Sequence, residues 1–313
     1  MKLEGLPLDA ADAQLFFSRK DANDPRVGDA VLCKPEDFAR AAVAIVGCPQ
    51  DEGVRRNGGR PGAAQAPAEI RRALYKLTVN GLDGIAIFDA GDTRIGKTLE
   101  DTHASQQQVV RAMLGAGKRV IALGGGNDIS YPDCSALAET ASDVLALNVD
   151  AHFDVRADHE RNSGTPYRQL LEEGRVKPAR FFEIGAQPFC NSPVYARWLA
   201  EKKVRVAWLD DLRKRGIDRV LRRILREAQN AQAVFWGMDV DVVRASDAPG
   251  VSAPNPLGMT GEEFCAIAAI AGAERRTRVI EFSECNPAFD IDGRTARLVA
   301  VAIHRYLAAL SQS

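Results

Sequence analysis

The stretch DVLALNVDAHFDVR, residues 143–156, joins a strand-like apolar run to a cluster of ionisable side chains. The run up to Val149 is apolar at almost every position, which is typical of a strand buried on both faces of a sheet. Three polar residues follow at alternating positions, Asp150, His152 and Asp154. If the strand geometry continues, these three side chains point to the same side. The stretch therefore predicts a buried strand with a polar site at its carboxyl end.

Further runs of the same kind recur along the 313 residues and alternate with amphipathic helical stretches such as 66–77 and 101–118. This alternation predicts an α/β fold, with three α/β/α layers around a mostly parallel sheet. The expected strands lie in 41–47, 84–91, 119–125, 143–150, 180–186, 204–210, 233–241 and 278–285. We expect residues 1–35 to form an irregular extension on the surface and residues 36–313 to form a single domain.

Bulk composition excludes several classes of function. The chain has 41 Lys+Arg, 42 Asp+Glu and a net charge of −1, which gives no electrostatic reason to expect a nucleic-acid partner. No stretch approaches the roughly 20 apolar residues of a membrane span, and the first residues do not resemble a signal peptide. The six cysteines are scattered without CxxC spacing, so we expect reduced thiols in a cytoplasmic protein.

A second acidic motif, FWGMDVDVV, places Asp239 and Asp241 at the end of another apolar run. A single aspartate in such a place is often a helix cap or a turn residue. Two such motifs put four carboxylates at one edge of the sheet, where ligands bind in parallel folds. Buried, unpaired charges are costly, so this set indicates bound cations, and its oxygen-rich chemistry favours Mn²⁺ over structural zinc.

The segment IALGGGNDISYPD, residues 121–133, places three glycines and Asn127 after a further strand. Glycines allow the backbone to approach a ligand closely. The Asn127 amide oxygen is a neutral ligand for a carboxylate-bound ion, but Asn127 is equally suited to cap a helix beginning near Ile129. The sequence leaves both interpretations open.

The motifs GGGND, NVDAHFD, WGMDVDVV…SAPNPLG and EFSECNP together resemble the arginase/agmatinase/formiminoglutamase superfamily of ureohydrolases. The resemblance implies an α/β/α fold and two Mn²⁺ ions per chain, with Asp150 and Asp239 bridging the two ions. The ligands it implies are Asn127, Asp150, His152, Asp154, Asp239 and Asp241. Most members carry histidine in place of Asn127, so we expect weaker binding at one ion; a degraded, non-catalytic site is the alternative.

Two further motifs resemble the formiminoglutamases within that superfamily. They are GCPQDEGVRRNGGRPGA, from Gly47, and SGTPYRQL, from Ser163. The implied substrate, N-formimino-L-glutamate, carries two carboxylates, and guanidinium groups bind carboxylates in a bidentate manner. We therefore expect Arg60 and Arg168 to clamp the substrate and Asn57 to add a hydrogen bond.

The resemblance also implies catalytic roles for two carboxylates. Asp154 is expected to pass a proton to the leaving amine, and Glu284 to pair with the cationic amidinium of the substrate. The products would be glutamate and formamide, as in histidine degradation, and the family suggests a homo-oligomer. The alternatives are an agmatinase, guanidinobutyrase or arginase, or a non-catalytic arginase-like binding protein. A dinucleotide-binding enzyme is disfavoured because G-x-G-x-x-G is absent.

Overall fold

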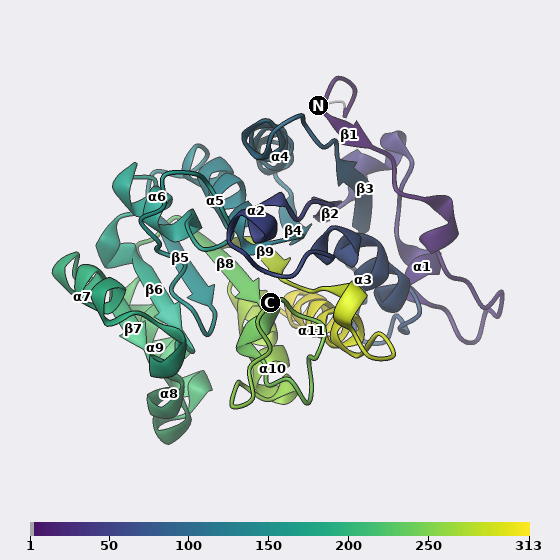
Figure 1. Cartoon of the computed structure of the whole chain (residues 1–313). Helices are drawn as coiled ribbons and strands as arrows, with labels where there is room; N and C mark the ends of the chain where they lie inside the picture. Colours follow the sequence, from purple (N-terminus) through teal and green to yellow (C-terminus); the bar gives the residue numbers. More distant parts are fainter. Residues whose placement is uncertain (1–2) are drawn as a thin grey trace.

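A computed structural model describes residues 3–313 and contains one nine-stranded sheet with helices on both faces (Figure 1). The spatial order of the strands is β1-β3-β2-β4-β9-β8-β5-β6-β7. Every neighbouring pair is parallel except β1 and β3, which are antiparallel. The strands are β1 (Leu8–Asp9), β2 (Val43–Gly47), β3 (Ile87–Thr93), β4 (Arg119–Leu123), β5 (Val144–Val149), β6 (Phe181–Ile184), β7 (Arg205–Ala207), β8 (Ala233–Asp239) and β9 (Thr277–Ser283).

The predicted three-layer α/β/α fold is confirmed, and each of the eight predicted strands forms. The α-helices are α1 (Val27–Ala30), α2 (Glu52–Arg56), α3 (Ala66–Leu74), α4 (Leu99–Gly115), α5 (Ser130–Ala138), α6 (Pro166–Glu172), α7 (Pro193–Glu201), α8 (Leu209–Arg215), α9 (Ile217–Glu227), α10 (Gly261–Ala273) and α11 (Arg294–Ser311). Helix α4 begins two residues earlier than predicted, because Thr98 and Asp101 form a reciprocal capping box at its start.

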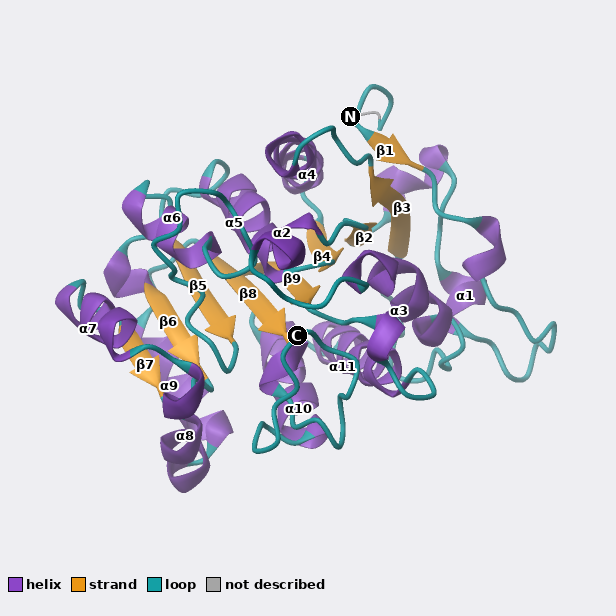
Figure 2. Cartoon of the chain, viewed as in Figure 1, coloured by secondary structure: helices purple, strands orange, loops and turns teal. Residues whose placement is uncertain are grey.

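Strand residues alternate between two hydrophobic cores, one on each face of the sheet. In β2, Val43 and Ile45 belong to the core shared with α3, α9, α10 and α11, whereas Ala44 and Val46 belong to the core shared with α4, α5 and α6. Figure 2 shows the strands in orange between these helical layers. Both faces are covered, which is why the strands read as continuous apolar runs.

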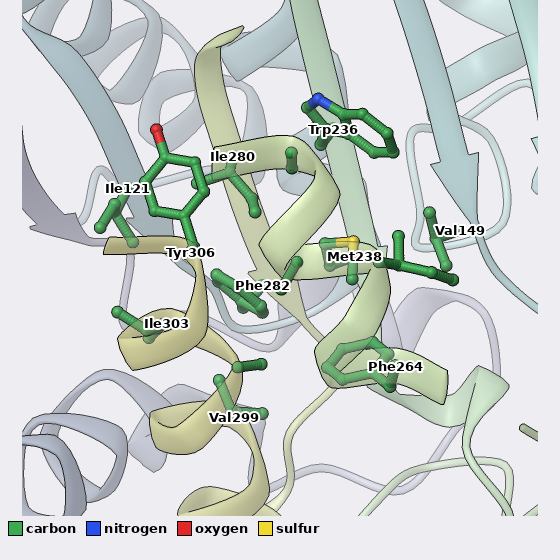
Figure 3. Close-up of a cluster of buried hydrophobic side chains, with 14 of the residues drawn as sticks. Ile121, Val149, Trp236, Met238, Phe264, Ile280, Phe282, Val299, Ile303 and Tyr306 are labelled. Atoms are coloured by element: carbon green, nitrogen blue, oxygen red, sulfur yellow. The ribbon is translucent and has the colours of Figure 1, made fainter. Parts of the chain in front are cut away.

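The first of these cores lies beneath the centre of the sheet. Figure 3 shows side chains of β8 and β9 packed against α10 and α11. Trp236, Met238 and Phe282 come from the sheet, and Phe264 and Ile303 come from the helices. This packing holds the central strands whose carboxyl ends carry the site.

Residues 3–35 contain only short elements, including β1, the 3₁₀ helix Ala13–Leu15 and α1. Strand β1 pairs with β3 and so extends the sheet at one edge. The Phe16 ring stacks on Tyr75 with their centroids 5.0 Å apart. This segment therefore packs against the edge of the sheet, on the flank away from β5 and β8 (Figure 1).

Four adjacent central strands end at the same level. Val149 of β5 pairs with Met238 of β8, and Asp239 of β8 pairs with Ser283 of β9. Leu123 of β4 in turn pairs with Phe282 of β9. Segments far apart in the sequence consequently meet at one edge of the sheet, where parallel folds bind ligands.

Candidate functional site

Both acidic motifs turn sharply as their strands end. The Asp150 carboxylate accepts a hydrogen bond from the backbone N–H of His152 at 2.7 Å, and Asp239 accepts one from the N–H of Asp241 at 2.8 Å. The side chains therefore converge through two side-chain-stabilised turns. The sequence predicted that strand geometry would continue through Asp154, but β5 ends at Val149. Strand β8 likewise ends at Asp239, before Asp241.

The turns build two overlapping groups of potential metal ligands. One group contains Asp150, His152 and Asp241, and the other contains Asp150, Asp154 and Asp239. Within each group the ligand atoms lie within 4.8 Å of one another. Because Asp150 belongs to both groups, two ions bound here would share its carboxylate.

Electrostatics indicate that negative charge predominates in this cluster. Burial, followed by repulsion from Asp241, raises the pKa of Asp150 to about 6. Burial and neighbouring carboxylates raise the pKa of Asp154 and that of Asp239 well above the usual range. Asp241 Oδ1 is buried without a hydrogen-bond partner. Buried carboxylates that repel one another and an unpartnered oxygen fit divalent cations, which would neutralise the charges and use the free oxygen.

The imidazole of His152 completes the first group. Its Nδ1 lies 3.3 Å from Asp241 Oδ2 and 3.4 Å from Asp150 Oδ1. The negative charge of Asp241 raises the pKa of His152. A cation among these carboxylates would favour the neutral imidazole, whose free nitrogen is a ligand for Mn²⁺.

Asn127 lies 1% exposed beside the same carboxylates. Its Nδ2 donates to Asp154 Oδ2 at 2.7 Å, and its Oδ1 accepts from the hydroxyls of Ser130 and Ser283. Its backbone N–H donates to Glu284 Oε1 at 2.9 Å. The amide side chain makes no cap hydrogen bond at the start of α5. Of the two interpretations of Asn127, the structure therefore places it beside the acidic cluster and not as a helix cap.

The two predicted catalytic carboxylates both have a strained backbone. The φ angle is 47° at Asp154 and 61° at Glu284, in the left-handed region that non-glycine residues rarely adopt. Burial and then Asp241 raise the pKa of Glu284 well above its usual range. Strained, buried carboxylates of this kind occur most often at functional sites.

A cleft of about 460 Å³ opens above the acidic cluster. Its lining includes the predicted residues Asn57, His152, Asp154, Asp239, Asp241 and Glu284, together with Arg156, Ser163 and Asn191. A larger groove of about 1010 Å³, between α9, α10 and α11, contains none of the predicted site residues among those that the structure describes. The chemistry that the sequence predicts is therefore gathered in the smaller cleft.

Asn57 is well placed in this cleft. Its Nδ2 donates to the Ser163 hydroxyl at 3.0 Å, which joins the two loops that the sequence singled out. Its Oδ1 is buried and has no hydrogen-bond partner. A free acceptor at the cleft wall can receive a hydrogen bond from a ligand.

Arg60 does not line the cleft, contrary to the clamp role expected for it. Its guanidinium donates to the backbone carbonyls of Val251 and Ser252. The guanidinium carbon lies 4.2 Å from the centroid of the Phe289 ring. Arg60 thus ties the loop after α2 to the loop after β8, because its Nε and Nη2 both donate to backbone carbonyls.

Arg168 is also directed away from the cleft. Its Nε lies 3.0 Å from Glu172 Oε1, one turn along α6, and its guanidinium carbon lies 4.4 Å from the centroid of the Trp198 ring. Its Nη1 donates to the Val155 carbonyl at 3.4 Å. Arg168 therefore stabilises the loop that carries Asp154 through the Val155 carbonyl and not through the cleft.

Arg156 is the residue that the sequence reasoning missed. Among the described residues that line the cleft, it is the one lysine or arginine. Its side chain is half exposed, and its nearest acidic partner, Asp158, lies 3.7 Å away. The motif DVR, which places Arg156 two residues after Asp154, was a signal in the sequence that could have identified it.

Comparisons with known proteins agree with this site. The arginase family model matches residues 41–308. The chain is 34% identical to a formimidoylglutamase of Ralstonia nicotianae over 312 residues, which cover 94% of this chain and 95% of that relative. In residues 3–313, no helix has both the length and the apolar character needed to cross a bilayer.

Solved structures are similar over nearly the whole chain. A Trypanosoma cruzi formiminoglutamase with Mn²⁺ has a TM-score of 0.86 at 32% identity, covering 92% of this chain and 99% of that chain. The formimidoylglutamase of Bacillus subtilis has a TM-score of 0.89 at 26% identity, covering 95% of each chain.

Proposed function

The chain belongs to the arginase family, and we propose that it is a formimidoylglutamase that uses two Mn²⁺ ions. It would hydrolyse N-formimino-L-glutamate to L-glutamate and formamide. The observation that carries the proposal is the two groups of potential metal ligands, which share Asp150 and lie beneath a cleft. Relatives and solved structures named for this activity cover more than nine-tenths of the chain.

The chain's own residues would hold the two ions as the acidic groups suggest. Asp150, His152 and Asp241 would hold one ion, and Asp150, Asp154 and Asp239 the other, with Asn127 beside the second. Asp239 would help Asp150 to hold both ions. When bound, two Mn²⁺ ions lower the pKa of a water molecule so that a nucleophile is available near neutral pH.

Two carboxylates would act on the substrate. Asp154 accepts a proton from the nucleophile and delivers it to the leaving amine, which becomes the amino group of glutamate. Glu284, at the cleft wall, pairs with the cationic amidinium and orients its carbon. A positive charge beside Glu284 lowers its raised pKa and so favours the ionised carboxylate.

Arg156 and Asn57 would bind the glutamate part of the substrate. Guanidinium binds carboxylates strongly, and Asn57 Oδ1 is a free acceptor for the N–H on the α-nitrogen of the substrate. We expect Arg156→Met to raise KM by about 10- to 100-fold, since a hydrogen bond to a charged group is worth about 1.5–3 kcal/mol. Steady-state kinetics would measure this, with Arg60→Met and Arg168→Met for comparison. A larger rise in KM for either comparison variant would return the clamp role to that arginine.

The direct test offers the Mn²⁺-loaded protein N-formimino-L-glutamate, L-arginine, agmatine and guanidinobutyrate in parallel. Release of glutamate and formamide from the first substrate alone is the expected result. Urea from a guanidino substrate would replace the proposal with another ureohydrolase activity. If the protein binds two ions but turns over none of the four substrates, the result would point to a non-catalytic arginase-like protein.

We further propose a setting for the enzyme: histidine degradation in the cytoplasm, as a homo-oligomer. The six cysteines are free thiols, which suits a reducing compartment. We also propose that residues 36–313 form the catalytic domain and that residues 1–35 are an extension on its edge. Light scattering of the purified chain, and activity of a protein lacking residues 1–35, would test the last two points.

A further inference from the structure

The side-chain amide of Asn127 lies between two sets of hydrogen-bonding groups. Its Nδ2 donates to Asp154 Oδ2 at 2.7 Å and to Asp150 Oδ2 at 3.4 Å. Its Oδ1 accepts from Ser130 Oγ at 3.0 Å and from Ser283 Oγ at 2.9 Å. An amide nitrogen carries two hydrogens and only donates. This orientation suits bare carboxylates, but it presents no ligand atom to a cation.

A half turn about the terminal side-chain bond would exchange the two amide atoms. This torsion is broad and roughly two-fold in asparagine, and the two ends of the amide have similar size. The oxygen would then face the carboxylate cluster, and the nitrogen would face Ser130 and Ser283. Serine hydroxyls accept hydrogen bonds as well as donate them, so the two serines can serve either orientation.

The surroundings of Ser130 favour the turned orientation. Its hydroxyl lies 2.6 Å from Glu281 Oε1, as a donor, and accepts from the Tyr167 hydroxyl at 3.1 Å. Its single proton cannot go to Glu281 and to Asn127 Oδ1 at the same time. After the half turn, Ser130 donates to Glu281 and accepts from both Tyr167 and Asn127, so every polar hydrogen and lone pair of the hydroxyl is used.

We propose that Ser130 and Ser283 are positioning residues that hold the Asn127 amide oxygen toward the metal pair. Glu281 and Tyr167 fix the direction of the Ser130 proton. All of these side chains are buried, where an unpaired amide nitrogen would be costly. The proposal rests on the metal-binding part of the proposed function. It also explains how asparagine can serve at this position: the two hydroxyls hold its amide in the one orientation that can bind a metal.

The test compares Mn²⁺ binding by the wild-type protein with binding by Ser130→Ala, Ser283→Ala and the double variant. Each change removes an acceptor for the amide nitrogen in the turned orientation. We expect the affinity for one of the two ions to fall by about 10- to 100-fold, the usual effect of losing such a supporting partner. An electron paramagnetic resonance titration, which counts free Mn²⁺ and detects the coupled pair, measures both sites separately from activity.

Ser135→Ala is the matched control. Ser135 lies on the same helix as Ser130, is equally buried, and its hydroxyl has no hydrogen-bond partner. We expect this variant to bind two ions with wild-type affinity. Unchanged binding by the double serine variant, or an equal loss in Ser135→Ala, would overturn the proposal.

A crystal structure of the Mn²⁺-loaded wild-type protein tests the same point without any substitution. Asn127 Oδ1 bound to a metal, with Nδ2 within hydrogen-bond distance of both serines, is the expected result. Two bound ions with Nδ2 still on Asp154 would overturn the role of the serines and leave the proposed function standing. A wild-type protein that binds fewer than two ions would contradict both.

Discussion

Two acidic clusters on this sheet balance their charge in different ways. On β3, Asp89 lies 2.9 Å from Arg71 Nε, and Asp92 lies 2.6 Å from Arg71 Nη1. The Arg71 guanidinium is fully buried and also donates to the Gly91 carbonyl, so each of its edges is used. This cluster contains its own cation and serves to join α3 to the sheet.

The central cluster has more carboxylates and no such cation. No lysine or arginine within residues 3–313 forms an ion pair with Asp150, Asp154, Asp239 or Asp241. The half-buried His152 is their one basic neighbour in the ion pairs of the described chain. A buried acidic group that is paired within the chain is structural, whereas one left without a cation is ready to bind one from solution.

The largest effect should follow from removing a carboxylate of the central cluster. We expect Asp154→Ala and Asp241→Ala to lower kcat/KM by about 10³-fold or more, since a proton-transfer group or a metal ligand is lost. Both proteins should keep their circular dichroism spectrum, because each change removes a repelling charge. Asp218→Ala, an exposed change on α9, should leave kcat/KM unchanged. Full activity in either cluster variant would end the assignment of these residues.

Removing the internal cation should instead affect stability. Arg71→Met leaves Asp89 and Asp92 without their partner, and we expect a loss of about 3–5 kcal/mol in the free energy of unfolding. Urea denaturation of the metal-loaded protein would measure it. The neighbouring change Arg72→Met breaks only an exposed pair with Glu69 and should cost less than about 1 kcal/mol. Equal losses in the two variants would contradict the contrast between the clusters.

Metal removal should make stability depend on pH. The folded-state pKa of Asp150 is raised to about 6 from its ordinary 3.8, so the folded protein binds more protons than the unfolded chain. The free energy of unfolding of the metal-free protein should therefore fall as the pH rises from about 4 to about 6. At pH 8, Mn²⁺ at 100 times its Kd should restore about 2.7 kcal/mol. Denaturation curves with Mn²⁺ and with a chelator test this; curves that coincide at pH 8 would show that the cluster needs no cation.

A third cluster of carboxylates holds a proton in place of a cation. Asp133 and Glu281 are both fully buried, Asp133 Oδ2 and Glu281 Oε2 have no hydrogen-bond donor, and burial raises the pKa of Asp133 to about 7. Wild-type stability should be lost as the pH rises through this range, and Asp133→Asn should remove that loss. The variant should gain up to about 4 kcal/mol on the wild type between pH 4 and pH 8, since the pKa rises from 3.8 to about 7 and one pKa unit is worth about 1.4 kcal/mol. Parallel stability curves for the two proteins would contradict a shared proton.

The fold was predictable because its signals are local. Apolar runs buried on both faces identified every strand from β2 to β9. Strand β1 was missed because two residues, Leu8 and Asp9, carry no periodic pattern. The meeting of Asp150 and Asp239 was predictable in outline, since both end buried strands, but the turns that aim them depend on hydrogen bonds to His152 and Asp241 that spacing does not reveal.

The arginines show where sequence reasoning stopped. Arg60 and Arg168 lie in motifs beside the site, but the direction of a long side chain depends on its tertiary partners. Phe289, which lies over the Arg60 guanidinium, is far from Arg60 in the sequence. Trp198, which lies over the Arg168 guanidinium, is on another helix. Arg156 lies two residues after Asp154, a spacing that the sequence shows, and the folded loop brings it to the cleft. Ser130 and Ser283 likewise meet Asn127 only in the folded chain.

The most direct test of the central claim is anomalous scattering from crystals of the protein saturated with Mn²⁺. The account predicts two manganese peaks, one among Asp150, His152 and Asp241 and the other among Asp150, Asp154 and Asp239, with the Asp150 carboxylate touching both. A single peak, no peak, or manganese bound elsewhere would contradict the claim that this cluster is left without a cation in order to bind two.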